Sequence, residues 1–557
     1  MIYLFIILIV ILALVIMSIV SEYSLIKKLK IKLKEEWGDV PQQEYTSEKL
    51  ESIKAYYLSK KDNVSDVDDI TWNDIDMDEI YMMMNNTQCS IGEEYLYALL
   101  RKPCLEKEEL IERNRLMNFF EKKEEERVSV QTKLRLVGKL SRISVYEYIN
   151  RLNDLDAKSN LGHFLMNLGL LLSIGLIFIS PGIGGICTVV MVVNNILQYY
   201  KEKPTIENYL TIFAFIFRLL DQSKELYKLD IQEIKPYTDM IKQDSERFNR
   251  YRRSAILLTP KQTSGNLADL ILDYVRMFTH IDLIMYNSMV RFFKNHRETL
   301  NRIYENIGLL DSMAAGASFR ALIHDYCEPE LVNTSHAFLY VNDLYHPLID
   351  EPVVNSIAED GSVLLTGSNA SGKSTFIKTL AINAILSQTI YTSTSKSYKS
   401  SFFKIYSSMA LRDNVLSKES YYIVEIKSLK RILNQVKEGV PTLCFIDEVL
   451  RGTNTLERIA ASSRILSSLA HKNAMVFAAT HDIELTHILE KDFSNYHFQE
   501  RIEENNIIFD YKLYKGKAVS KNAIKLLNML GYPKEIIDSA EGAAEDFLNK
   551  GEWSRVN

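Results

Sequence analysis

The sequence predicts two kinds of structure: a mainly helical region with membrane-spanning segments, followed by a mixed α/β domain. Only 21 of the 557 residues are Gly and 11 are Pro, about half the usual share, which leaves room for long helices. Residues 2–20 and 159–200 contain no Asp, Glu, Lys or Arg. From about residue 336, short apolar runs bounded by Gly, Asn and Asp replace the helical pattern and indicate strands.

The overall composition is that of an ordinary globular protein and excludes a mostly disordered or fibrous chain. Hydrophobic residues make up 47% and charged residues 25% of the sequence. The formal net charge of −6 gives no general electrostatic attraction to nucleic acid. The five cysteines form no C-x-x-C pair, so we expect reduced thiols in the cytosol, without a disulfide framework or a cysteine zinc site.

The first uncharged segment, residues 2–20, is about as long as the roughly 20 residues that cross a bilayer as a helix. It lacks the basic start and the short apolar core of a cleaved signal peptide. Positively charged flanks stay in the cytoplasm, so the lysines that follow predict an N-terminus outside the cell: Lys27, Lys28, Lys30, Lys32 and Lys34. We therefore expect a transmembrane anchor at 1–21, and the alternative is a buried core helix.

The second uncharged segment, about residues 162–199, is interrupted by Pro and Gly within 180–185. Each side offers slightly fewer than the roughly 20 apolar residues of a spanning helix, which predicts a transmembrane hairpin at 161–200 with both ends in the cytosol. Three amide side chains weaken this prediction: Asn167, Asn194 and Asn195. A re-entrant or buried hairpin is therefore the alternative.

Helical periodicity and charged runs fill the remainder of the amino-terminal part. We expect a helical core at 22–160 and a helical lever that continues it at 201–335, one on each side of the hairpin. The α/β domain is predicted at 336–540 and is followed by a carboxy-terminal tail at 541–557.

One stretch of the α/β domain predicts a nucleotide site. The apolar run 362–366 is typical of a buried strand, residues 367–374 fit the phosphate loop G-x-x-x-x-G-K-[ST], and helical spacing follows. Loop N–H groups and the positive end of the next helix hold phosphate oxygens. In this motif Lys373 contacts the β- and γ-phosphates and Ser374 ligates Mg²⁺. The candidate nucleotide contacts are Gly367, Ser368, Asn369, Ala370, Ser371, Gly372, Lys373, Ser374 and Thr375.

Two later strands end in polar side chains suited to catalysis. The apolar run 442–446 leads into Asp447, a candidate Mg²⁺ ligand, and Glu448, which is placed to orient and deprotonate an attacking water. The run 475–480 ends at His481, at the edge where open α/β sheets bind ligands, and this side chain is suited to sensing the γ-phosphate or positioning water. The alternatives are a solvated acidic turn and a structural histidine.

Together with their neighbours, these residues resemble the ATPase domain of the MutS family of DNA mismatch repair proteins. The loop has the family's Asn and its G-K-S-T ending, residues 447–455 follow D-E-x-x-R-G-T-x-T, and residues 479–485 follow A-T-H-x-x-E-L. His346-Pro347 and the G-x-P-x-x-[IV]-I pattern at 531–537 also agree. The resemblance covers about 336–540 and implies an α/β, ABC-type P-loop ATPase domain that binds ATP and Mg²⁺.

The resemblance also implies further site residues and a homodimer of ATPase domains. It adds Asn369 to the candidate catalytic residues, beside Glu448 and His481, and His346 to the nucleotide contacts. A signature segment, 413–425, would complete the partner's ATP site through two serines, Ser417 and Ser420. The family's usual Gly is Lys418 here, and a bulky residue where backbone approaches phosphate is expected to slow hydrolysis without removing ATP binding.

The amino-terminal region departs from the mismatch repair members, which read DNA with an amino-terminal domain carrying a Phe-x-Glu wedge. The predicted anchor and the early start of the helical core leave no room for that reader. Phe-x-Glu strings do occur at 119–121, in a charged helix, and at 498–500, inside the ATPase domain, and we interpret both as coincidence. The uncharged hairpin stands about where the family inserts its DNA clamp.

The sequence therefore predicts a MutS-family ATPase anchored in the cell membrane, with its N-terminus outside and its ATPase domain in the cytoplasm. ATP binding would close a dimer and hydrolysis would reopen it, which drives a conformational switch. One alternative is binding of mismatched or branched DNA, which neither the charge nor a reader domain supports. Another is an ATP-gated membrane scaffold or transport energiser. The expected partners are a second copy and membrane lipid, with a membrane protein as a further candidate.

Overall fold

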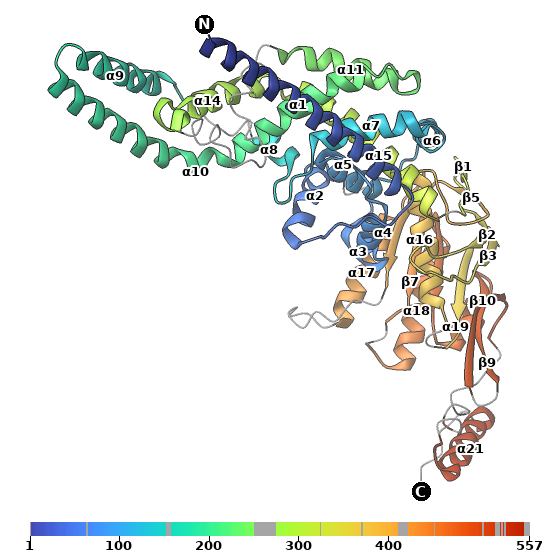
Figure 1. The fold of residues 1–557 in the computed structure, drawn as a ribbon. Helices are drawn as coiled ribbons and strands as arrows, with labels where there is room; N and C mark the ends of the chain where they lie inside the picture. The colour runs from blue at the N-terminus through green and yellow to red at the C-terminus, as the bar shows by residue number, and fades with distance from the viewer. Residues whose placement is uncertain are drawn as a thin grey trace. The chain divides into compact units, whose positions relative to one another are not determined.

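The computed structural model of this chain has two compact units, which Figure 1 draws as a ribbon. Unit 1 comprises Met1–Lys61, Tyr81–Arg101 and Ile111–Leu322, and unit 2 comprises Asp62–Ile80, Lys102–Leu110 and Ile323–Asn557. The residues that the structure describes are 2–62, 65–151, 158–249, 274–323, 325–368, 371–409, 421–450, 452–503, 506–518, 524, 527 and 531–550.

Unit 1 is built from helices, as the low content of Gly and Pro predicts. They are α1 (Ile2–Glu35), α2 (Ser47–Ser59), α5 (Ser90–Arg101), α7 (Glu124–Val137), α8 (Val145–Arg151), α9 (Leu161–Ile177), α10 (Pro181–Tyr227), the 3₁₀ turn η1 (Gln232–Ile234), α11 (Lys235–Glu246), α14 (Ile281–Lys294) and α15 (Arg297–Ile323). The helices α4 (Met77–Met84) and α6 (Lys107–Lys122) have residues assigned to both units, as does α15, whose last residue Ile323 belongs to unit 2.

Buried carboxylates join α5 to α15 in the core of unit 1. Glu94 accepts a hydrogen bond from the Tyr304 hydroxyl at 2.8 Å, and burial raises the pKa of Glu94 to about 7. Asp311 accepts the backbone N–H groups of Gln88 and Cys89, just before α5, at 2.9 and 3.0 Å. Burial raises the pKa of Asp311 to about 6. A buried acceptor with several donors fixes the two helices against each other.

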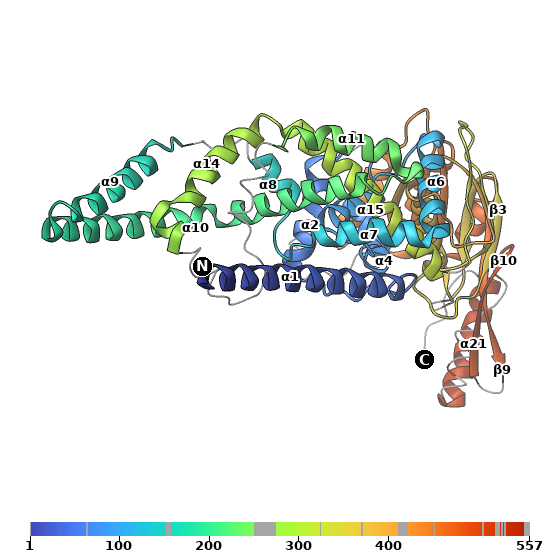
Figure 2. The ribbon, with the colours of Figure 1, turned by 45° about the horizontal axis from the view of Figure 1, so that its top comes forward.

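The second uncharged segment forms a helical pair, α9 and the first part of α10, which projects beyond the other helices of unit 1 in both views (Figures 1 and 2). Within the described residues, Pro181–Pro204 is long and apolar enough to cross a membrane by length and composition, and 17% of its apolar window is buried. A soluble core helix is mostly buried, so this exposure needs another explanation. The first uncharged segment lies in the continuous helix α1; that it crosses a membrane stays a prediction.

Unit 2 contains two β-sheets. The four-stranded sheet has the order β1-β5-β2-β3, and the six-stranded sheet has the order β10-β9-β4-β8-β7-β6. The strands are β1 (Glu330–Val332), β2 (Leu339–Leu344), β3 (Asn355–Glu359), β4 (Ser362–Thr366), β5 (Ser397–Ser401), β6 (Lys404–Ser408), β7 (Thr442–Asp447), β8 (Ala474–Ala479), β9 (Phe493–Glu503) and β10 (Asn506–Lys515). The larger sheet is parallel from β9 to β6, and β10 pairs with β9 in the antiparallel direction.

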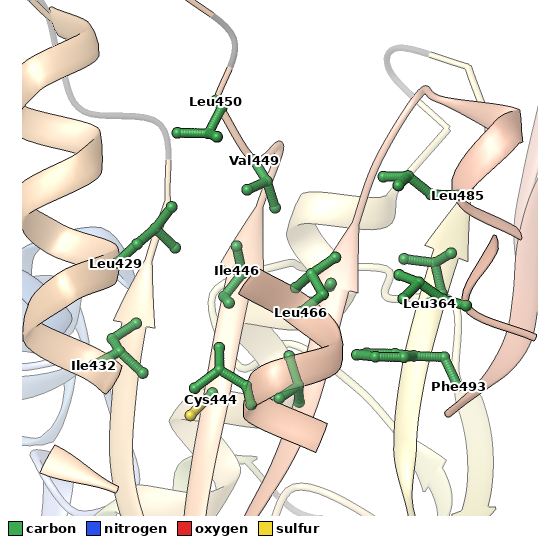
Figure 3. Packing of buried hydrophobic residues seen from close by; sticks show 14 of the residues in the cluster. Leu364, Leu429, Ile432, Cys444, Ile446, Val449, Leu450, Leu466, Leu485 and Phe493 are labelled. Carbon is green, nitrogen blue, oxygen red and sulfur yellow. The ribbon is translucent and has the colours of Figure 1, made fainter. Parts of the chain in front are cut away.

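Helices alternate with these strands, as the predicted α/β domain requires. They are α16 (Lys373–Thr389), α17 (Tyr421–Gln435), α18 (Thr455–Ala470), α19 (Ile483–Ile488) and α21 (Lys534–Lys550). Apolar side chains of α17 and α18 pack on the six-stranded sheet, and Figure 3 shows Leu429 and Leu466 among the residues of this cluster. The core thereby fixes the strands whose ends carry the candidate site.

The segment 62–80 belongs to unit 2, whereas the sequence analysis assigns it to the helical core at 22–160. Its short helix α3 (Asp69–Asp74) lies against β6, where Thr71 Oγ1 accepts the Ser407 N–H at 3.0 Å. The Asp74 carboxylate accepts the Ser407 hydroxyl at 2.6 Å. These contacts are polar and join segments far apart in the sequence, so apolar periodicity does not reveal them.

Candidate nucleotide-binding site

The candidate residues meet at the carboxyl edge of the six-stranded sheet because three neighbouring parallel strands end there. Strand β8 lies between β4 and β7, and its Ala479 is in register with Leu365 of β4 and with Asp447 of β7. The residues that follow these positions therefore leave the sheet at the same level. This register brings the predicted loop, the acidic pair and His481 to one edge.

The glycine loop, residues 367–372, connects β4 to α16 and needs glycine at both ends. Gly367 has φ +149° and Gly372 has φ +106°, values that L side chains rarely adopt. A Cβ added at Gly367 would lie 2.8 Å from the carbonyl oxygen of Phe498, which is backbone and cannot turn away. Helix α16 starts at Lys373, so its positive end faces the loop.

Side chains of the loop region hold one another in place. The buried Lys373 ammonium donates to the carbonyl oxygens of Gly367 and Ser368, both at 2.8 Å. The Ser371 hydroxyl donates to the Ser368 carbonyl at 2.8 Å. Ser374 and Thr375 are exposed at the start of α16. The predicted contacts Asn369 and Ala370 lie outside the described residues.

Asp447 is a candidate metal ligand on an observation independent of the motif. The residue is 9% exposed at the end of β7, and its Oδ1 is buried without a hydrogen-bond partner among the described residues. A buried carboxylate oxygen without a donor suits a cation. A hard cation such as Mg²⁺ takes oxygen ligands, and one carboxylate with one hydroxyl is typical of phosphate-linked sites. Asp447 with the exposed Ser374 hydroxyl therefore fits Mg²⁺ by ligand chemistry.

Glu448 and His481 form the pair that is best placed for proton chemistry. His481 Nε2 lies 2.9 Å from Glu448 Oε1, and the Glu448 N–H donates to the Ala479 carbonyl at 2.9 Å. Glu448 has φ +56°, so its backbone leaves the strand sharply and turns the carboxylate to the sheet edge. The side chains are 13% and 34% exposed, which leaves the pair accessible to water. A carboxylate oriented by an imidazole can accept a proton from a water molecule.

The segment after Glu448 is held by α17 and α18. The Leu450 N–H donates to the buried carboxylate of Glu425 on α17, and Leu450 has φ +61°. The Ser462 hydroxyl of α18 donates to the Val449 carbonyl at 3.3 Å. Figure 3 shows Val449 and Leu450 in the apolar cluster. From sequence, Glu425 is named only as the end of the signature segment. The available signal was helical spacing, because Glu425 lies three and four residues before the buried Ser428 and Leu429 and so shares the buried side of α17.

Sequence reasoning also missed an ion pair next to His481. Arg458 of α18 donates to both carboxylate oxygens of Asp482, from Nε at 2.9 Å and from Nη2 at 2.6 Å. A bidentate pair of this kind fixes orientation as well as position. Asp482 precedes α19, so the pair joins α18 to the turn that carries His481. The adjacency of Asp482 to His481 was the available signal.

The string Phe498-Gln499-Glu500, interpreted from sequence as coincidence, lies in β9 against the glycine loop. The Ser368 hydroxyl donates to the Glu500 carboxylate at 2.8 Å. The ring of Phe498 contacts that of Phe376 on α16, with 5.9 Å between centroids. In β10, the half-exposed ring of Tyr511 lies near Gly372, where an added Cβ would be 3.3 Å from it. These residues support the loop, and their distance along the chain hid them from motif analysis.

Among the described residues, the groups that interact with the His346 imidazole are Lys378, Asp76 and the Leu348 N–H, and none of them belongs to the glycine loop. Burial lowers the pKa of His346 to about 4, and the positive charge of Lys378 on α16 acts in the same direction. The negative charge of Asp76 acts in the opposite direction but is the smaller effect. The imidazole is therefore neutral near pH 7, and its Nδ1 accepts the Leu348 N–H at 3.3 Å. Contact of His346 with nucleotide stays a prediction. The signature residues Ser417 and Ser420, and Lys418 between them, lie outside the described residues.

Fold and site together define a mixed α/β domain of the ATPase type. The family model for MutS domain V matches residues 363–548. The DNA mismatch repair protein MutS of Thermotoga maritima is 27% identical over 321 residues, which cover 56% of this chain and 39% of that protein. The DNA mismatch repair protein MSH3 of Debaryomyces hansenii is 25% identical over 351 residues (58% and 33%). Human MutS protein homolog 4 is 27% identical over 286 residues (48% and 30%).

Residues 363–548, about a third of this chain, match domain V of the MutS family, and the similarity to these relatives supports membership of that family. This confirms the resemblance found in the sequence motifs, and ATP binding and ATPase activity are properties of the family in general. The matched regions span between 30% and 39% of the length of these three relatives. The activities of the full-length relatives are therefore not assigned to this chain.

Proposed function

We propose that this chain is a membrane-attached ATPase of the MutS family, which binds ATP with Mg²⁺ at the carboxyl edge of the six-stranded sheet. The observation that carries the proposal is the Glu448–His481 pair at 2.9 Å beside the orphaned oxygen of Asp447. A proton acceptor and a metal ligand on adjacent residues, next to a glycine loop and a helix N-terminus, suit hydrolysis of the phosphoanhydride bond of a nucleoside triphosphate.

In this proposal each group has a separate role. The loop backbone and the start of α16 bind the phosphates, and the Lys373 ammonium offsets their negative charge. Glu448 accepts the proton of the attacking water, while His481 holds the carboxylate in position. Asp447 and Ser374 would hold Mg²⁺, which supplies charge neutralisation on the phosphate oxygens when it is bound. Asn369 belongs to the same site by resemblance to the family.

The role of Glu448 is tested by Glu448→Gln, which keeps the size of the side chain and removes its basicity. We expect the steady-state rate of ATP hydrolysis to fall by about 10²- to 10⁴-fold, the usual contribution of a general base. ATP binding, measured by equilibrium titration, should be retained. The matched control is Glu438→Gln, which changes an exposed glutamate before the opposite end of β7. Equal turnover in Glu448→Gln and the control would remove Glu448 from the mechanism.

The proposed switch is a homodimer in which each signature segment completes the ATP site of the partner. The support is the family resemblance of residues 413–425, together with Glu425, which ties the start of α17 to the segment after Glu448. A signature segment that senses a neighbour's nucleotide would thereby act on the hydrolytic carboxylate of its own subunit. Sedimentation of the detergent-solubilised chain, with and without ATP, tests whether nucleotide brings two copies together.

Attachment to the membrane is proposed from the exposed apolar helices of unit 1. The helix Pro181–Pro204 has a mean hydropathy of 1.4 over its apolar window, and only 17% of that window is buried. With α1 as the anchor, the N-terminus would lie outside the cell and the ATPase domain in the cytoplasm. Flotation of the full chain with lipid vesicles, and its release by detergent but not by salt, test the attachment.

A second candidate function is binding of mismatched or branched DNA, which the names of the relatives from Thermotoga maritima and Debaryomyces hansenii favour. Binding of labelled duplex and branched DNA at low and high salt tests it, because phosphate contacts give a steep salt dependence. No retention of any DNA at low salt would exclude this function and leave the ATP-gated scaffold or transport energiser as the alternative use of the ATPase.

A further inference from the structure

We propose that the α9–α10 hairpin enters a single leaflet of the bilayer and turns inside the hydrocarbon, so that it does not span the membrane. The inference rests on the membrane attachment proposed above and concerns how the attachment is made. It departs from the transmembrane hairpin that the sequence predicts at 161–200 and commits to one partner, the lipid of the leaflet that faces the ATPase domain.

The first argument is length. Helix α9 runs from Leu161 to Ile177, which is about 25 Å of helix and less than the roughly 30 Å of a hydrocarbon core. Its first turns are also held by polar contacts to another part of unit 1. The Asn167 amide donates to the Thr279 carbonyl at 2.6 Å, so only Leu168–Ile177, about 15 Å, continues beyond them. That length reaches about the middle of a bilayer.

A band of polar groups crosses the base of the hairpin, all buried except the half-buried Asn167, and we call it the polar seam: His163, Asn167, Asn195, Tyr199, His280 and Asp282. His163 Nδ1 lies 3.1 Å from His280 Nδ1, and His280 Nε2 lies 2.8 Å from the Asn195 carbonyl. The Tyr199 hydroxyl donates to Asp282 at 2.8 Å. Ionisable groups are costly inside hydrocarbon, so the polar seam marks the level of the membrane surface.

The surface beyond the polar seam is mainly apolar, with Asn194 as an exposed polar side chain at its base. The exposed large apolar residues are Leu168, Leu171, Leu172, Ile174, Phe178, Ile179, Ile183, Ile186, Val189, Val190 and Val193. A soluble surface rarely exposes so many large apolar side chains together. The two helices approach closely through small residues, since a Cβ at Gly184 would lie 2.4 Å from the backbone of Ile177. The pair is therefore a preformed unit whose outside matches lipid.

The turn itself decides between spanning and re-entry. A spanning hairpin would place its turn in water on the far side, where polar residues are expected, yet Phe178 and Ile179 are 87% and 83% exposed here. Several N–H groups of the turn have acceptors within the chain: Ile179 and Ser180 donate to the Leu176 carbonyl at 3.1 and 2.8 Å, and Gly184 donates to the Ser180 carbonyl at 2.8 Å. Non-helical backbone at membrane depth requires such internal partners.

The experiment places one cysteine at the turn of the full-length chain. Cys187 lies in the hairpin, so Cys187→Ser is the parent, and Ser180→Cys and Lys201→Cys are added to it singly. Each variant is reconstituted in vesicles and treated with a membrane-impermeant maleimide from one side and then from the other. Retained ATPase activity shows that each variant is folded. The flanking position 201 should react from the side of the ATPase domain.

For position 180 we expect labelling from neither side above the Cys187→Ser background, and reaction only after denaturation in detergent. An environment-sensitive dye attached there should be quenched most strongly by quenchers carried near the bilayer centre. Labelling from the side opposite the ATPase domain shows a spanning hairpin and overturns the inference while membrane attachment stands. Labelling from the same side as position 201 shows a hairpin outside the lipid and also overturns it. Failure of the parent to float with vesicles overturns the attachment itself.

Discussion

The glycine loop of unit 2 and the hairpin turn of unit 1 use the same residue types for opposite purposes. In the loop, Gly367 and Gly372 adopt positive φ, and the Lys373 ammonium donates hydrogen bonds to two loop carbonyl oxygens. In the turn, backbone N–H groups are used internally, and Gly184 is a helical residue that allows close packing. In the functions proposed above, the loop would receive a charged ligand, whereas the turn, whose exposed large side chains are apolar, would face lipid.

The comparison teaches that glycine content alone does not report function. Both segments interrupt apolar runs with small residues, and both precede a helix. What separates them is the sign of φ and the nature of the partner of each backbone group. A ligand-binding turn keeps hydrogen-bonding capacity for its ligand, whereas a turn in hydrocarbon must satisfy that capacity within the chain.

The largest effect is expected from Gly367→Ala. The added Cβ would lie 2.8 Å from the Phe498 carbonyl oxygen in a backbone conformation that alanine rarely adopts, and strain of this kind costs about 1–3 kcal/mol. We therefore expect ATP affinity to fall by roughly tenfold to a hundredfold in equilibrium titration, with loss of turnover. Gly361→Ala is the control, since no atom lies within 4 Å of its Cβ. Equal affinity in the two variants would show that the loop does not bind nucleotide.

A smaller effect, confined to the hairpin, is expected from Gly184→Ala. Overpacking costs about 1–3 kcal/mol, and the added Cβ would lie 2.4 Å from Ile177 N. Closeness of the helices can be read from a disulfide between Ser173→Cys and Thr188→Cys, because the hydroxyl oxygens lie 3.3 Å apart. The yield of this disulfide should fall when Gly184→Ala is added and stay unchanged when Gly185→Ala is added, because no atom lies within 4 Å of a Cβ at position 185. ATP affinity should not change, and a change would contradict the separation of the two turns.

The smallest effect is expected from Glu425→Gln, which weakens the hydrogen bond to the Leu450 N–H without removing the acceptor. Replacing a charge-assisted hydrogen bond by a neutral one costs about 1 kcal/mol, so kcat should fall several-fold while KM stays unchanged. The pH dependence of kcat should shift as well, because Glu448 is less firmly placed against His481. A several-fold change in KM with an unchanged kcat would instead show that Glu425 contributes to ATP binding and does not position Glu448.

Motifs carried most of what the sequence could predict about the site. Gly367, Lys373, Asp447, Glu448 and His481 are brought to one edge because each lies at the end of a strand or in the segment after it, and strand ends in a parallel sheet are fixed by register. The predicted α/β domain and the helical amino-terminal region are confirmed. Asn369, Ser417 and Ser420 lie outside the described residues.

Contacts between distant segments could not be predicted. Glu425 reaches Leu450, and Ser368 reaches Glu500, only after β7 and β9 have taken their places in the sheet. The packing of α3 on β6 likewise depends on single polar bonds that leave no periodic trace. A segment's own pattern reports which face it buries, and it does not report which partner covers that face.

The length of α10 has a mechanical consequence. This helix runs without interruption from Pro181, at the apolar tip of the hairpin, to Tyr227, about 70 Å away, and Pro204 lies inside it. A proline in a helix removes one backbone hydrogen bond, so bending is easiest there. A long helix that is held in lipid at one end and bends at one point would transmit movement along its axis but would bend under a sideways force. In the proposed attachment, Pro204 would therefore divide α10 into a part that moves with the lipid and a part that moves with the helical core.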